Sequence, residues 1–384
     1  MDDSHSTTVH ETTSDPESMD GSSRAWVTPR GDFLNTAWAP DDVSPDPTSL
    51  SHEWSYQTDT KRMFVPLVRE NLVVASSKSP NGDVFGLDSK DSTDRWTSED
   101  DSLLRTEPTF LSGSVFGLRG DSIEGVVEKI HGDLEAPSVE IGNGMKLRSV
   151  GDELIIGHAK SGMKQVEILG VEPGANQSNW KYEMFDIGDI VDIAIQGSII
   201  YVGGNEYDEN SDVLEGTGSV TAYNIDEQTV LWEQTESGDI EAIAVGDSNL
   251  FVIGPGIIAI NKSSGEVVWR RELSWVGTSY PAVGPNRVYT AGKDQIIALN
   301  KSDGEKSWKE SMNGISVRPS IGGETVFTVA TRRGDSPSRF VALDKETGER
   351  LFETTFGQTA ITAPAIANNA VFLGVDDGTV HKYS

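Results

Sequence analysis

A short acidic segment has the residue types of a calcium-binding loop. Asp208, Asn210 and Asp212 occupy alternate positions, where such a loop places its first oxygen ligands. The sixth position of the loop needs Gly for a sharp turn and is Val213 here. The twelfth needs a bidentate Glu and is Ser219. These two departures favour a solvated acidic hairpin, so we predict no metal ligands.

No pattern for nucleophilic catalysis stands out. Ser161 and Lys164 match the Ser-x-x-Lys spacing, but they lie among turn residues and not at the start of a helix. The chain has no Cys, no Gly-x-Ser-x-Gly sequence and no glycine-rich phosphate-binding motif. We therefore predict no catalytic residues.

Basic and aromatic residues form a third candidate site. They recur just before the inner strands expected below, in a chain with only 31 Lys and Arg. Guanidinium groups gathered at one place would bind an anionic ligand or an acidic peptide. Pairing with local carboxylates is the alternative. The candidates are Arg62, Arg105, Arg148, Trp275, Tyr280 and Arg318.

The charge of the chain limits its partners. Against 31 Lys and Arg it has 61 Asp and Glu, a formal net charge of -30. Such a surface repels phosphate backbones and anionic lipids, so we expect no nucleic-acid or membrane partner. The acidity favours either plain solubility or adaptation to high salt, where screening suppresses the mutual repulsion of carboxylates.

The first 24 residues differ from the rest of the chain. They are rich in Ser, Thr, Asp and Glu and nearly free of apolar residues, which predicts a disordered acidic tail before a single domain over residues 25–384. We see neither a signal peptide nor an apolar run of 18 residues. We therefore expect a cytoplasmic monomer with no membrane span.

The elements that would position these residues come from an internal repeat in residues 258–308. Each copy has a short apolar strand, an Asn, a Gly four residues later and a Trp eight residues after the Asn; the two Trp residues are Trp269 and Trp308. A period near 40 residues with four strand-like pieces indicates the blades of a β-propeller. Asx followed by Gly predicts a tight hairpin before the outermost strand.

The spacing of eight from Asx to an aromatic residue recurs elsewhere. The pairs are Asp88–Trp96, Asn224–Trp232, Asn261–Trp269, Asn300–Trp308 and Asp344–Phe352. A second spacing of eight, from Pro to an aromatic residue, marks the first two strands of a blade. Its pairs are Pro108–Phe116, Pro281–Tyr289, Pro319–Phe327 and Pro364–Phe372. We expect the outer-strand aromatics to pack between neighbouring blades.

Eight blades follow from these spacings. Trp54 and Trp180 mark further outer strands, and the long gap between Trp96 and Trp180 predicts a degenerate blade with its outer strand near residues 126–130. The last repeat, residues 362–383, lacks an outer strand, and the strand around Trp54 lacks inner ones. We therefore predict an all-β, eight-bladed propeller of four antiparallel strands per blade, closed by the N-terminal strand.

Residues 342–352 carry a family resemblance. The sequence Ala-Leu-Asp-Lys-Glu-Thr-Gly-Glu-Arg-Leu-Phe resembles the repeat of the pyrroloquinoline-quinone (PQQ)-like β-propellers. The N-terminal part of the chain has Trp26, Gly31-Asp32 and residues 35–40 before Trp54. It is similar to the corresponding part of family members from salt-loving archaea. The family includes quinoprotein dehydrogenases. That resemblance implies PQQ stacked between a Trp and a ring made by adjacent Cys residues, and calcium held by Glu, Asn and Asp. It also includes scaffolds of outer-membrane assembly.

The functional expectation is a non-catalytic scaffold that binds a protein or peptide. The lack of Cys departs from the quinoprotein pattern, so we expect no cofactor. A PQQ-dependent oxidoreductase and a ligand-binding sensor with an anion site at the mouth of the channel are the alternatives.

Overall fold

The computed structural model describes residues 31–32, 35–78, 83–98, 103–120, 125–139, 141–159, 165–185, 187–206, 216–273, 280–331, 337–357 and 360–384. The tail predicted for residues 1–24 lies outside this part. Among the described residues, no helix is long and apolar enough to cross a membrane.

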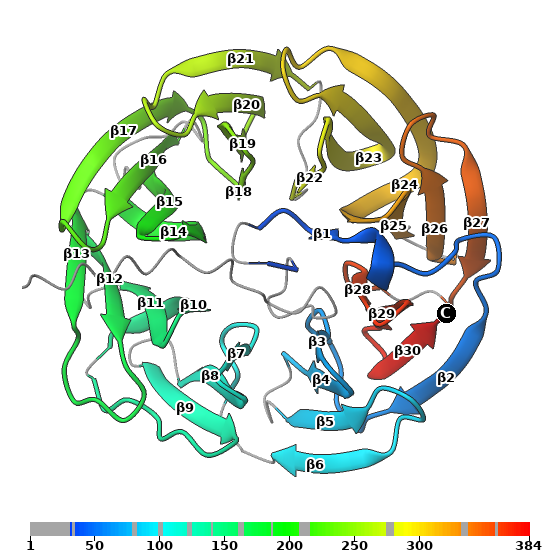
Figure 1. Ribbon diagram of the computed structural model, residues 1–384, viewed down its shortest axis with the longest axis horizontal. Coiled ribbons are helices and arrows are strands. Elements are labelled where there is room, and N and C mark those ends of the chain that lie inside the picture. The colour runs from blue at the N-terminus through cyan, green and yellow to red at the C-terminus, as the bar shows by residue number, and fades with distance from the viewer. Residues whose placement is uncertain are drawn as a thin grey trace, which may run out of the picture.

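The strands form a ring of eight antiparallel blades, which confirms the predicted propeller (Figure 1). Blades 1 and 2 comprise β3 (Leu67–Arg69), β4 (Leu72–Ser76), β5 (Val84–Asp88) and β6 (Asp94–Ser98), then β7 (Thr109–Leu111), β8 (Ser114–Gly120) and β9 (Gly125–His131). Blades 3 and 4 comprise β10 (Asn143–Val150), β11 (Glu153–Ala159), β12 (Gln165–Val171) and β13 (Trp180–Phe185), then β14 (Ile187–Gln196), β15 (Ile199–Glu206), β16 (Thr217–Asn224) and β17 (Thr229–Ser237).

The second half of the ring follows the same order. Blade 5 comprises β18 (Ala242–Val245), β19 (Asn249–Ile253), β20 (Gly256–Asn261) and β21 (Val267–Glu272). Blades 6 and 7 are joined through long strands, β22 (Ala282–Val283), β23 (Arg287–Asn300), β24 (Lys306–Gly322), β25 (Thr325–Thr331), β26 (Arg339–Asp344) and β27 (Arg350–Thr355). Blade 8 comprises β28 (Ala365–Ala367), β29 (Ala370–Gly374), β30 (Thr379–Tyr383) and β2 (His52–Gln57).

The closure of the ring joins the two parts of blade 8. Strand β2 pairs antiparallel with β30, with Trp54 opposite Lys382 and Tyr56 opposite Val380. This confirms that the N-terminal strand completes the last blade. Closure leaves no open gap between the first and last blades, so no sheet edge is exposed there.

The degenerate blade corrects one strand assignment. Residues 126–130 lie in β9, which pairs with β8 as the third strand of blade 2, whereas we predicted the outer strand. No fourth strand is present among the described residues of this blade. Instead Leu134, Ala136 and Val139 of the irregular segment after β9 pack against its core. Without an Asx–aromatic pair, the spacing could not distinguish a third strand from a fourth.

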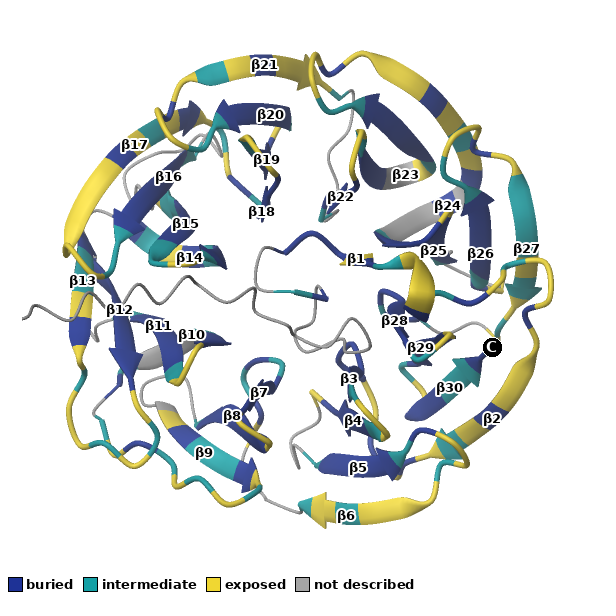
Figure 2. Cartoon of the chain, in the orientation of Figure 1, coloured by how far each residue is buried: buried dark blue, intermediate teal, exposed yellow. Residues whose placement is uncertain are grey.

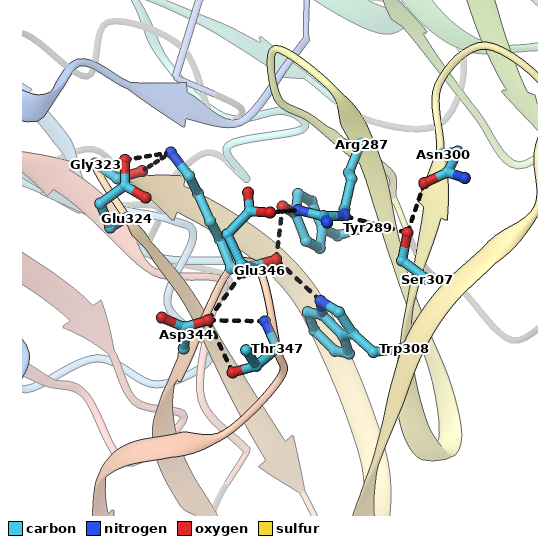
Figure 3. Close-up of polar contacts among 11 residues, drawn as sticks. Arg287, Tyr289, Asn300, Ser307, Trp308, Gly323, Glu324, Asp344, Glu346 and Thr347 are labelled. Carbon is cyan, nitrogen blue, oxygen red and sulfur yellow. Dashed lines mark hydrogen bonds and ion pairs between the residues drawn. The ribbon is translucent and has the colours of Figure 1, made fainter.

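The repeat residues explain how neighbouring blades hold together. Trp308 lies opposite Ala298 in its own blade, and its indole Nε1 donates to the carbonyl of Lys345 in the next blade, at 2.9 Å. The same carbonyl accepts the hydroxyl of Tyr289 at 3.1 Å (Figure 3). Trp232 and Trp269 donate in the same way to the next blade, at 2.8 and 3.1 Å. These Trp side chains are thus bridges between blades.

The residue two positions before each Asx is Gly or Ala, and the same packing explains why it is small. Gly86 lies opposite Trp96, and a Cβ atom at Gly86 would approach the Trp96 ring within 2.2 Å. Trp96 in turn stacks on His131 of blade 2, with ring centroids 4.3 Å apart. The outer strands leave alternate residues exposed and the inner strands are almost fully buried (Figure 2).

The turns before the outer strands have the predicted Asx geometry. The Asn261 side-chain oxygen accepts the backbone N–H groups of Ser263 and Ser264, both at 3.0 Å. Gly265 follows with a φ of 75°, a left-handed conformation that Gly adopts at little cost. Ser92 and Gln228, which replace this Gly in two blades, are held in the same conformation, with φ of 61° and 52°.

Candidate functional site

The segment that leads into β1 lies near the centre of the ring, beside blades 6 and 7 (Figure 1). Strand β1 (Trp38–Ala39) pairs in parallel with β24, and the short 3-10 helix η1 (Asp41–Val43) follows it. The carbonyl of Thr36 accepts the N–H of Val283, and that of Ala37 accepts the N–H of Ile321. The segment is thereby fixed to blades 6 and 7.

We call residues 35–43 the plug. Asn35 lies at its inner end. It is fully buried, and its Nδ2 group donates to the carbonyls of Ile193 and Ile243, at 3.0 and 3.4 Å. Its third acceptor is the carboxylate of Asp192, at 3.1 Å. Asp192 also accepts the backbone N–H groups of Ile193 and Ile243. Arg148 completes the network, with its Nη2 3.4 Å from the Asp192 carboxylate.

A cavity opens at the opposite end of the ring. Its volume is about 740 Å³. Along β14, residues 189–191 line this cavity, Asp192 lies below them, and Ile193 contacts the plug. The other lining residues come from blades 1, 2, 3, 6 and 7: Phe64, Lys78, Leu103, Leu104, Arg105, Thr106, Glu107, Lys146, Tyr280 and Arg318.

Two of the cavity's cations rest on aromatic rings. The Arg318 guanidinium lies 3.8 Å from the ring centroid of Tyr280, and the Lys78 ammonium lies 4.6 Å from that of Phe64. Stacking of a cation on an aromatic face is favourable and restricts the side chain to one orientation. Aromatic contacts therefore orient two cations of the cavity, Arg318 from blade 7 and Lys78 from blade 1.

Glu107 lies among these cations. Burial opposes its ionisation, but the charges of Arg318, Lys78, Arg148 and Lys146 outweigh that effect and hold the pKa of Glu107 below its usual range. Burial raises the pKa of Asp189, and Lys146 opposes the rise. The cavity thus keeps one ionised carboxylate at the centre of its positive charge.

The structure separates the predicted binding residues. It brings Arg105, Tyr280 and Arg318 to one cavity. Arg148 is only 5% exposed and lies beneath the cavity in its pair with Asp192. Arg62 is exposed, and its charge acts on Asp376. Trp275 lies outside the described residues, as does the whole acidic segment of Asp208, Asn210 and Asp212.

Several residues of the site were missed from the sequence. Lys78 follows a second strand and Lys146 lies inside a first strand, so neither belongs to the strand-leading positions on which we relied. Asn35 lies in the segment that carried the archaeal resemblance, and Asp192 lies in no motif. The left-handed conformations of Asn35 and Ala37, with φ of 59° and 50°, are visible only in the structure.

The cavity lining does not match the quinone and calcium sites implied by the resemblance. The chain has no Cys to stack on a quinone, and no Trp lines the cavity among the described residues. In the same part of the chain, no group of three His, Cys, Asp or Glu side chains is placed to hold a metal ion. The residues present therefore do not fit PQQ with calcium.

Comparisons with known proteins agree with the architecture. The family model described as outer membrane protein assembly factor BamB matches residues 216–327 and 311–384. No curated protein sequence matches the chain. The crystal structure of BamB from Moraxella catarrhalis is 16% identical, with a TM-score of 0.66, and the match covers 87% of this chain and 99% of that one.

A redox enzyme and a designed protein share the fold. Quinohemoprotein alcohol dehydrogenase from Comamonas testosteroni is 13% identical, with a TM-score of 0.72 over 95% of this chain and 81% of that one. The computationally designed Ika8 protein is 15% identical, with a TM-score of 0.68 over 87% and 99%. Residues 216–384 therefore carry PQQ-like repeats of the BamB type, in a chain with the eight-bladed propeller fold of the quinoproteins.

Proposed function

We propose that this protein is a non-catalytic scaffold that presents the open face of its ring to a protein or peptide partner. The observation that carries the proposal is the convergence of residues from six blades on one cation-lined mouth, while the Asn35 segment is bonded to blades 4 to 7 at the opposite end. Propellers draw binding sites from the loops of several blades at such a mouth. The BamB-type repeat supports a role in assembly.

The test compares two surfaces of the same molecule. Affinity capture from cells of origin should recover a defined protein with the wild type and lose it with the double variant Arg105→Gln, Arg318→Gln. The matched control, Arg95→Gln, changes an arginine on outer strand β6 that pairs with Asp88. A partner retained by the cavity variant and lost by the control would place the contact on the rim of the ring and overturn the proposal.

A PQQ-dependent oxidoreductase is the second candidate, because the quinohemoprotein dehydrogenase shares the fold. Addition of PQQ and calcium should then change the visible absorbance and raise the melting temperature, since a ligand that binds only the folded state stabilises it. The lining has no Cys to stack on the quinone, which predicts no change in the visible absorbance.

The setting of the scaffold is part of the proposal. We place it in the cytoplasm of a salt-adapted cell, as the acidic composition and the archaeal resemblance suggest. Fractionation of cells with an antibody against the chain tests the compartment. Recovery with the cell envelope would instead match the role in the BamB description.

A further inference from the structure

The cavity at the open mouth concentrates positive charge in a strongly acidic chain. Its lining includes Lys78, Arg105, Lys146 and Arg318 against two carboxylates, Glu107 and Asp189. The local balance is thus an excess of two positive charges, whereas the whole chain has a formal net charge of -30. A hollow that reverses the sign of the surrounding surface attracts small anions once they are inside it.

The cations of the cavity lie on separate blades. They come from blades 1, 2, 3 and 7, so a ligand that contacts them must bridge separate blades. Arg318 and Lys78 are oriented by Tyr280 and Phe64. Such preorganisation lowers the entropy lost on binding, and guanidinium groups pair with carboxylate or phosphate in a bidentate manner.

Glu107 balances these cations within the protein. Arg318, Lys78, Arg148 and Lys146 all act on this one carboxylate. Its position shows that an anionic oxygen is favoured at this point of the cavity. A ligand that pairs with the cations of more than one blade needs more than one anionic group.

The size of the ligand follows from the cavity and from the charge of the chain. A volume of about 740 Å³ lies in the range of pockets for small molecules. The pocket has a floor, because the Arg148–Asp192 pair and Asn35 lie beneath it. An extended acidic chain would lie against the acidic surface and be repelled, whereas a compact anion fits inside.

We propose that the open mouth binds a small organic anion carrying at least two carboxylate or phosphate groups. This inference goes beyond the scaffold function, and it stands whether or not a protein docks on the same face. The bound anion would bridge Arg318 with the cations of the neighbouring blades and would not need the outer surface of the ring.

Calorimetric titration with citrate and, separately, inorganic phosphate at low ionic strength tests the proposal. Arg318→Gln should weaken binding of the preferred anion about tenfold or more, and Glu107→Gln should tighten it about fivefold, since it removes the internal competitor. Arg95→Gln should leave the affinity unchanged. The ratio of the two affinities separates a carboxylate from a phosphate ligand.

Two outcomes would overturn the inference. One is the absence of heat and of any change in melting temperature with either anion at millimolar concentration. The other is binding that responds equally to Arg318→Gln and Arg95→Gln, which would mean a non-specific effect of charge. Because Glu107→Gln acts in the opposite direction to Arg318→Gln, a general loss of folding cannot imitate the expected result.

Discussion

The Asn35 side chain donates to the Asp192 carboxylate at 3.1 Å, although 157 residues separate the two in the chain. The contact joins the N-terminal plug to the first strand of blade 4 in the interior of the ring. Arg148 approaches the same carboxylate from blade 3. A single buried Asp thus ties the N-terminal segment to blades 3 and 4.

Replacement of Asn35 by Ala should destabilise the protein. The change removes the two N–H donors of a fully buried amide and leaves the carbonyl acceptors on Ile193 and Ile243 without them. An unsatisfied buried acceptor costs about 1–3 kcal/mol. Urea unfolding should therefore show a lower midpoint than in the wild type. The exposed Asn286→Ala is the control, and equal midpoints for the two variants would contradict the assigned role.

The bridging indoles should show two separable contributions. Trp308→Phe keeps an aromatic ring but loses the hydrogen bond to the Lys345 carbonyl and part of the buried ring, so it should cost about 1–2 kcal/mol. Trp308→Ala also removes the buried ring and should cost about 3–5 kcal/mol. Denaturant midpoints measure both. If Phe proves as harmful as Ala, the hydrogen bond would be the main bridge and not the ring.

The two turns that lack Gly offer stabilising changes. A left-handed conformation destabilises the folded state by about 1–2 kcal/mol for a residue other than Gly. Gly avoids this strain but loses more conformational entropy on folding, which costs about 0.5–1 kcal/mol. Gln228→Gly should therefore raise the stability by about 0.5–1 kcal/mol, and Ser92→Gly likewise.

The opposite change at a natural Gly is the control for these turns. Gly348 has a φ of 76°, and a Cβ atom there would lie 2.7 Å from the Trp308 ring. Gly348→Ala should lower the melting temperature, whereas Gln228→Gly should raise it. Destabilisation by both changes would show that Gln228 makes a compensating contact.

The pairing of β2 with β30, which closes the ring, should weaken in acid. The Nδ1 atom of His381 lies 3.2 Å from the Nε2 atom of His52 across the β2–β30 pair. Burial, and next the charge of His52, lower the pKa of His381 to about 4, against the opposing effect of Asp377. The unfolded chain binds this proton near pH 6.5. This group therefore does not reduce the free energy of unfolding above pH 6.5. As the pH falls from 6.5 to 4, the unfolded chain takes up the proton first, and the free energy of unfolding decreases by up to about 3 kcal/mol.

Unfolding at several pH values measures this effect. In His381→Gln the slope between pH 6.5 and 4 should be smaller than in the wild type, because the group that titrates is gone. His52→Gln should reduce the slope partly, since it removes only the neighbouring charge. An unchanged slope in His381→Gln would assign the acid sensitivity to other groups.

Salt should stabilise a chain of this charge. The formal net charge of -30 produces repulsion that added salt screens over distances beyond about 3 Å at 1 M. We expect the melting temperature to rise from dilute buffer to multimolar potassium chloride. Sodium sulfate at matched ionic strength distinguishes screening from salting-out. A protein that melts higher in dilute buffer would contradict adaptation to salt.

The sequence predicted what local chemistry controls. Asn261 and Gly265 specify a tight turn, and Ala259 must be small because Trp269 crosses it. These requirements act within a dozen residues and repeat with each blade, so they revealed the number of blades and the closure at Trp54. The same reasoning failed at residues 126–130, where the turn and the aromatic residue are missing.

Only the tertiary structure decided the functional geometry. Lys78 and Lys146 do not share a sequence motif with Arg318, yet the ring brings all three to one cavity. Arg148, which resembles Arg318 in the sequence, lies buried against Asp192. Whether a cation faces a ligand or an internal carboxylate depends on residues from other blades. Spacing along the chain carries no information about such contacts, because they arise when the ring closes.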